Sequence, residues 1–236
     1  MGFFGRIFGK SDAEVTRKAK EAIRKAERST KEHQEKAAPF RRLSSAIIHA
    51  ASECQKRITP LIHGDTADTE EERLVREMRC LFEFLYFFMH MTNREAFSKL
   101  GAERRNKLQE IICPDVAGVA VDSFMEHFPV EKKKQVRALF YDRMNAADSD
   151  YGSAKEWLSR ENFAHCVLGR LGFNVDQAIG SDNPEIAMKS VDVACAEMRS
   201  SNIDQLVEAT RNVIDDFEVS KYDPWDDPSY PSQHSE

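Results

Sequence analysis

The residues best suited to chemistry lie in one strongly apolar stretch, residues 74–97. Successive residues of an α-helix are about 100° apart, so the polar side chains of this stretch fall within about 60° of one another. We call them the polar seam: Arg76, Arg79, Glu83, His90 and Arg94. Together with Tyr86, the carboxylate of Glu83 and the imidazole of His90 could line an internal pocket as acid, base or ligands.

Two interpretations of the polar seam stay open. In the first, the protein is a helical enzyme or a ligand- or metal-binding bundle that uses Glu83, His90 and Tyr86. In the second, the seam is a hydrogen-bonded structural network, since buried polar groups are costly unless they are paired. The Glu-x-x-His motif of bundle metal sites is absent from the sequence, as are His-Glu-x-x-His, Gly-x-Ser-x-Gly and glycine-rich phosphate loops. The sequence therefore favours the structural network over a catalytic site, with no metal and no cofactor.

The apolar stretch itself predicts a buried helix, because a helix that is apolar on nearly every side must be covered by others. Ser/Thr-x-x-Glu capping boxes at Ser11, Thr69 and Ser153 predict helix starts. Asn183 before Pro184 predicts another, with proline at the first helical position. Gly172 is predicted to end a helix in a Schellman motif.

These signals and the apolar periodicity predict helices over residues 12–36, 40–58, 69–100, 103–112, 114–128, 130–145, 154–171, 184–199 and 202–217. Pro39 and Pro60 are expected to separate or end the first two. Strand signals are missing. The sequence thus predicts an all-α, bundle-like domain around the helix 69–100. We divide the chain into a basic amphipathic arm and polar helix (1–38), a helical domain (39–217) and a flexible acidic, aromatic tail (218–236).

Charge is distributed unevenly along the 236 residues, although the net charge is only −6. Residues 1–62 contain 14 Lys and Arg against 7 Asp and Glu, a net charge of +7. Residues 63–236 contain 20 against 33, a net charge of −13. The basic first quarter indicates an anionic partner, which could be lipid, nucleic acid or the acidic remainder of the protein.

The amino terminus combines apolar and basic residues: Phe3, Phe4, Ile7 and Phe8 with Arg6 and Lys10. An apolar wedge followed by a polybasic helix supplies the two signals that reversible membrane association needs. The alternative is that these aromatic side chains pack on the protein's own core. Nucleic acid is disfavoured, because no aromatic residue is interleaved with the basic residues of the helix 12–36.

The tail carries an aromatic and acidic cluster: Tyr222, Trp225, Asp226 and Asp227. Trp225 either buries its indole in a partner as a short linear motif or packs back on the bundle. The five cysteines form no Cys-x-x-Cys pair, which is typical of free thiols in a reducing compartment. We expect a cytoplasmic, non-catalytic interaction or adaptor module that binds a protein partner. An anionic membrane surface and a second copy of the chain are the other partners that the sequence allows.

Overall fold

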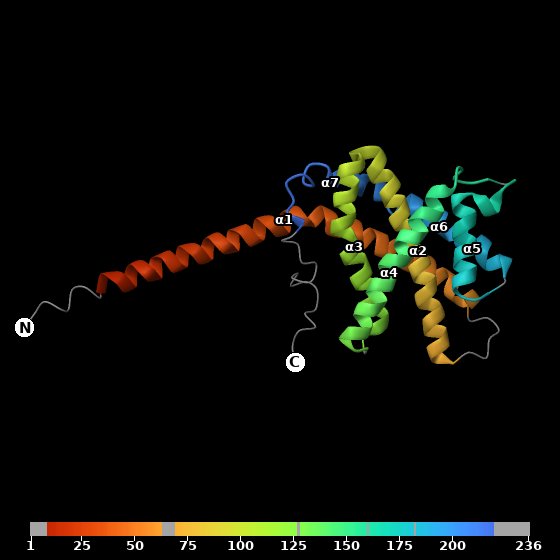
Figure 1. Ribbon diagram of the computed structural model, residues 1–236, viewed down its shortest axis with the longest axis horizontal. Helices are drawn as coiled ribbons and strands as arrows, with labels where there is room; N and C mark the ends of the chain where they lie inside the picture. Colours follow the sequence, from red (N-terminus) through yellow and green to blue (C-terminus); the bar gives the residue numbers. More distant parts are fainter. Residues whose placement is uncertain (1–8, 63–68, 127, 160, 182, 220–236) are drawn as a thin grey trace, which may run out of the picture. The chain divides into compact units, whose positions relative to one another are not determined.

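The computed structural model describes residues 9–62, 69–126, 128–159, 161–181 and 183–219 (Figure 1). Its elements are α1 (Gly9–Ile62), α2 (Glu70–Leu100), α3 (Ala102–Met125), α4 (Val130–Ser153), the 3-10 turn η1 (Phe163–His165), α5 (Val167–Ala178), α6 (Pro184–Ser200) and α7 (Ile203–Thr210). No strand occurs in these residues, so the all-α prediction is confirmed. The chain divides into two compact units, Met1–Ala38 and Pro39–Glu236.

Helix α2 is the centre of the second unit, as predicted, and packs against α3, α4, α5 and α7. Its interior half is almost entirely buried, including the wholly buried Phe84, Phe87 and Phe88. The predicted capping box at Thr69 is present: the Glu72 amide donates to Thr69 Oγ1 (3.2 Å), and the Thr69 amide donates to Glu72 Oε2 (2.8 Å). None of the helices in the described ranges is both long and apolar enough to cross a membrane.

The predicted helix break at Pro39 is wrong. Helix α1 runs through Pro39 and Pro60 to Ile62, and it begins at Gly9, so Ser11 lies inside it and does not cap it. A proline inside a helix removes one amide donor and crowds the preceding turn. Burial on the next turn offsets this cost, because Phe40 is fully buried and its ring centroid lies 4.7 Å from that of Phe217.

Within the second unit, the later part of α1 packs through an apolar stripe. The stripe residues Phe40, Leu43, Ile47, Ala50, Ala51, Cys54 and Ile58 are all buried. Two polar contacts fix neighbouring helices against it. Ser44 Oγ donates to Asp115 Oδ2 of α3 (3.2 Å), and Arg57 forms an ion pair with Glu197 of α6 (2.7 Å).

Two other predicted interruptions are also absent. Helix α3 continues through Pro114, where the flanking Ile111 and Val116 are fully buried. Helix α4 extends to Ser153, so residues 148–152, which were expected to form a loop between the predicted helices 130–145 and 154–171, are helical. In contrast, α7 ends at Thr210, earlier than predicted, and turns carry the chain onward.

The predicted helix over residues 154–171 is the largest error. Residues 154–159 and 161–162 form no helix, and α5 begins only at Val167. The first amides of α5 donate to this segment: Val167 to the carbonyl of Glu156 (3.0 Å) and Leu168 to that of Trp157 (3.2 Å). The irregular segment therefore supplies acceptors that a helix start needs, and Ser153 ends α4 without starting a helix.

The predicted helix end at Gly172 is wrong as well, because α5 continues to Ala178. A Cβ at Gly172 would lie 2.7 Å from the carbonyl oxygen of Ala187, so this glycine allows α5 and α6 to approach closely. The Schellman motif occurs at Gly180, whose φ is 67°. There the Gly180 amide donates to Gln177 O and the Ser181 amide to Asp176 O, both at 3.0 Å.

Candidate functional site

The five residues of the polar seam do not share one environment. Arg79 and Arg94 are exposed, and Arg76 is half-buried in the first turns of α2. Glu83 is half-buried and His90 is only 4% exposed. The structure therefore places Glu83 and His90 in the interface between α2 and α4, and separates them from the arginines.

His90 is held by a carboxylate from α4. Its Nδ1 lies 2.7 Å from Asp148 Oδ1. The hydrogen bond from His90, with a further one from Asn93, keeps the pKa of Asp148 below its ordinary value, so Nδ1–H donates to an ionised carboxylate. Such a pair orients an imidazole in many catalytic sites. Here His90 Nε2 is buried and has no hydrogen-bond partner among the described residues.

Aromatic side chains fill the space beside the seam. Tyr151 of α4 is fully buried, and its ring centroid lies 5.5 Å from that of His90 and 5.8 Å from that of Phe87. Tyr86 is buried against Phe140, at 5.0 Å between centroids. Burial raises the pKa of both phenols above the ordinary value, so both stay protonated at neutral pH.

Glu83 is the group of the seam with the most unusual chemistry. Burial raises the pKa of Glu83 to about 7, Asp150 raises it further by repulsion, and Arg143 opposes both. No hydrogen bond or ion pair holds its carboxylate within the part of the chain described here. A carboxyl group that changes charge near neutral pH is a candidate acid, base or cation ligand.

Three residues of this interface escaped the sequence reasoning: Asn93, Asp148 and Tyr151. Asp148 and Tyr151 fell in the expected loop, whereas α4 continues through both. Their spacing of three residues on a helix brings them to one face. This spacing, together with the apolar Phe140 earlier on the same helix, is the sequence signal that could have predicted a helix with Asp148 and Tyr151 on one face.

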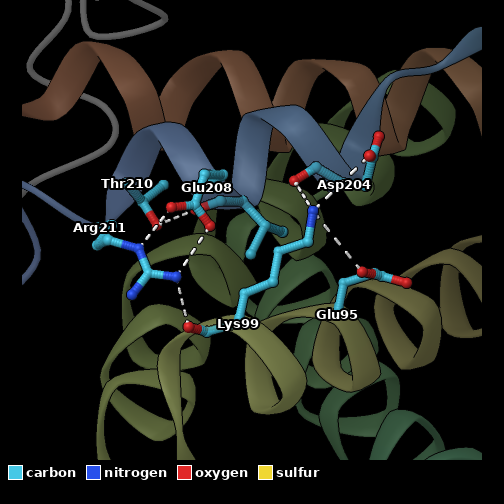
Figure 2. Close-up of polar contacts among 7 residues, drawn as sticks. Glu95, Lys99, Asp204, Glu208, Thr210 and Arg211 are labelled. Carbon is cyan, nitrogen blue, oxygen red and sulfur yellow. Dashed lines mark hydrogen bonds and ion pairs between the residues drawn. The ribbon is translucent and has the colours of Figure 1, made fainter.

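A second polar cluster joins the end of α2 to α7 (Figure 2). Lys99 Nζ donates to the carbonyl of Asp204 (2.7 Å) and lies 3.9 Å from the Glu95 carboxylate. Arg211 donates to the carbonyl of Lys99 (2.6 Å) while it pairs with Glu208. Because the last carbonyls of a helix lack internal partners, Arg211 stabilises the carboxyl end of α2, and Lys99 connects that end to the first turn of α7.

We expect Asp148→Ala to lower the free energy of unfolding by about 1–3 kcal/mol at neutral pH, because it leaves the buried Nδ1–H of His90 without an acceptor. Since the folded-state pKa of Asp148 is lowered, this contribution is present above the ordinary aspartate range and is lost as the pH falls through the folded-state value. Urea unfolding measures the change. Asp142→Ala, at an exposed position of the same helix, is the control and should cost under about 0.5 kcal/mol. Equal losses would contradict the role of Asp148.

The structure places no other predicted site residue beside the seam. Lys10 lies in α1. The remaining arm residues (Phe3, Phe4, Arg6, Ile7, Phe8) and the tail residues (Tyr222, Trp225, Asp226, Asp227) lie outside the described residues. Among those that are described, no group of three or more His, Cys, Asp or Glu side chains could hold a metal ion. Comparison of the chain with known protein families, curated proteins and solved structures finds no match.

Proposed function

We propose that this protein is a non-catalytic helical interaction module, in which an amino-terminal helical arm binds a partner and residues 39–217 form the scaffold. The observation that carries the proposal is the length of α1, which continues from the scaffold through Pro39 into the separate unit Met1–Ala38. Because a helix this polar buries little apolar surface on its own, its charged side chains are suited to an external partner.

The exposure of the arm supports this role. Arg24, Lys25, Lys31 and Glu32 are all exposed. His90 and Tyr151 offer no comparable access, because both side chains are buried. Interaction through the arm is therefore better supported than catalysis in the scaffold.

We place the protein in the cytoplasm as part of the same proposal. All five cysteines are free thiols, and four of them are buried. Burial raises the pKa of Cys54 and Cys80, which keeps them as unreactive thiols. Free thiols of this kind persist in a reducing compartment.

Truncation before Pro39 tests the proposal. The full chain and the truncated chain are immobilised separately and exposed to an extract of the source cells. We expect the truncated chain to keep its helical circular dichroism and cooperative unfolding, because residues 39–219 hold the buried core, and to lose partner capture. If deletion of the arm leaves capture unchanged, the arm is not the binding element.

A ligand-binding bundle centred on Glu83 is the second candidate, favoured by its half-buried carboxylate without an ion pair. Metal analysis and absorbance spectra of the purified protein test it. A metal or chromophore that is lost in Glu83→Ala would favour this candidate over the interaction module.

A further inference from the structure

One side of the arm carries only basic and neutral residues over its length from residue 10 to residue 31. The helical period of α1 places six cations within about 80° of one another, a sector we call the basic face: Lys10, Arg17, Lys20, Arg24, Arg28 and Lys31. Ala13 is the only other residue of this sector between its ends. At 1.5 Å per residue, the basic face is about 32 Å long.

The other cations of the arm are arranged differently. Lys18, Lys25 and Lys36 each follow a glutamate by four residues, at Glu14, Glu21 and Glu32. This order and spacing favour intrahelical ion pairs. These three lysines lie at least about 60° from the basic face, with their glutamates about 20–40° from it, and they provide an equal number of exchangeable lysines for a control.

We propose that the basic face docks on a membrane surface rich in anionic lipid; this inference rests on the arm being the binding element. A series of cations that the helical period places on one face matches a planar array of headgroups, and Arg24 and Lys31, the two members whose exposure is described, are exposed. The sequence just before the basic face contains Phe3, Phe4 and Phe8. Phenylalanine side chains can be buried in the hydrocarbon region of a lipid bilayer, whereas the phosphate backbone of a nucleic acid offers no apolar region for them. No aromatic residue lies between residues 10 and 31 to stack on bases, which disfavours single-stranded nucleic acid.

The expected loss of vesicle affinity follows from the electrostatic attraction that each cation of the basic face contributes. Each cation close to an anionic surface strengthens binding about fivefold, and the gain declines within one Debye length of the surface. Three cations of the face therefore account for about a hundredfold in vesicle affinity. Lys18, Lys25 and Lys36 stand farther from the surface and contribute less.

The test uses the full chain and sedimentation with vesicles of phosphatidylcholine, with or without phosphatidylserine. The face variant is Arg17→Glu, Arg24→Glu and Lys31→Glu; the control variant is Lys18→Glu, Lys25→Glu and Lys36→Glu, with the same change in net charge on the same helix. We expect the wild-type chain to bind only the phosphatidylserine vesicles and to be released by salt. The face variant should bind at least about a hundredfold more weakly, and the control less than about tenfold more weakly.

Circular dichroism checks that both variants keep the wild-type helicity. If the face variant does not, Arg17→Gln, Arg24→Gln and Lys31→Gln replace it, because glutamine retains helix propensity. Equal losses in the face and control variants would overturn the proposal, since net charge alone would then explain binding. Wild-type binding to an acidic protein or to nucleic acid, without binding to either vesicle, would also overturn it.

The two proposals fail separately. If truncation before Pro39 abolishes partner capture while vesicle binding is absent from the wild type, the arm is a protein-binding element and the lipid inference is wrong. If truncation changes neither capture nor vesicle binding, both the interaction module and the lipid inference are wrong.

Discussion

Replacement of Gly169 by alanine is expected to destabilise the helical domain by about 3 kcal/mol or more. A Cβ at this position would overlap the carbonyl of Phe163 and would lie 3.2 Å from Cys166 Sγ. The Phe163 carbonyl cannot retreat easily, because it accepts hydrogen bonds from the Cys166 amide (3.2 Å) and the Cys166 thiol (3.0 Å). The added methyl group must therefore separate η1 from the start of α5.

Two other glycines provide graded comparisons in the same urea unfolding experiment. The Cβ of Gly172→Ala would lie 2.7 Å from Ala187 O, so we expect a loss of about 1–3 kcal/mol. The Cβ of Gly152→Ala would meet only His90 Cε1, at 4.0 Å, and alanine also favours the helix, so this change should be close to neutral. If Gly169→Ala were as stable as Gly152→Ala, the close approach of η1 to α5 would be refuted.

Replacement of Glu83 by glutamine is expected to stabilise the protein at alkaline pH and to have little effect in acid. The pKa of Glu83 is raised from 4.5 to about 7 in the folded protein, chiefly by burial. The folded protein therefore keeps a proton on Glu83 at pH values where the unfolded chain has released it. The free energy of unfolding consequently falls as the pH rises from the ordinary pKa of glutamate through the folded-state pKa of Glu83. Glutamine removes this penalty. After allowance for solvent screening of the half-buried carboxylate, the gain is about 1–3 kcal/mol at about pH 8.

Urea unfolding at about pH 5 and about pH 8 measures this difference. Glu110→Gln, at an exposed position of α3, is the control and should show no difference between the two pH values. If Glu83→Gln were instead less stable than the wild type at about pH 8, the Glu83 carboxylate would have a cationic partner in the folded protein. That outcome would favour the ligand-binding bundle.

Some features that depend on neighbouring residues in the sequence were predicted accurately, whereas the capping boxes predicted at Ser11 and Ser153 were wrong. The all-α class and the burial of the middle of α2 follow from the almost wholly apolar composition of residues 80–92. The helix starts at Thr69 and Asn183 follow from side-chain oxygens that accept from amides two or three residues ahead. These interactions close within one helical turn, so the sequence predicts them wherever the tertiary structure does not extend the helix past the cap or end it there.

The prolines show where local reasoning fails. A proline inside a helix costs about 3 kcal/mol, which predicts a break. Burial of one large apolar side chain contributes about 1.5–3 kcal/mol, and several are buried within one turn of Pro39 and Pro114. Tertiary packing therefore exceeds the local penalty, and α1 and α3 remain continuous.

The glycines show a second limit. Gly172 and Gly180 both follow helical stretches, yet only Gly180 adopts a positive φ and ends the helix. The role of Gly172 is set by the backbone of Ala187, fifteen residues later in the chain. The periodicity of apolar residues in the sequence does not show that α5 approaches α6 closely at Gly172.

By itself, the sequence determined that Glu83 and His90 lie on one side of a buried helix and that a polar, basic helix precedes the core. Only the tertiary structure decided what those side chains meet: His90 pairs with Asp148, and Glu83 has no ion pair among the described residues. The physical reason is the range of the interactions. Helical periodicity acts within a few residues, whereas the desolvation and pairing that set the chemistry of a side chain depend on segments 58 residues apart, as in the pair of His90 and Asp148.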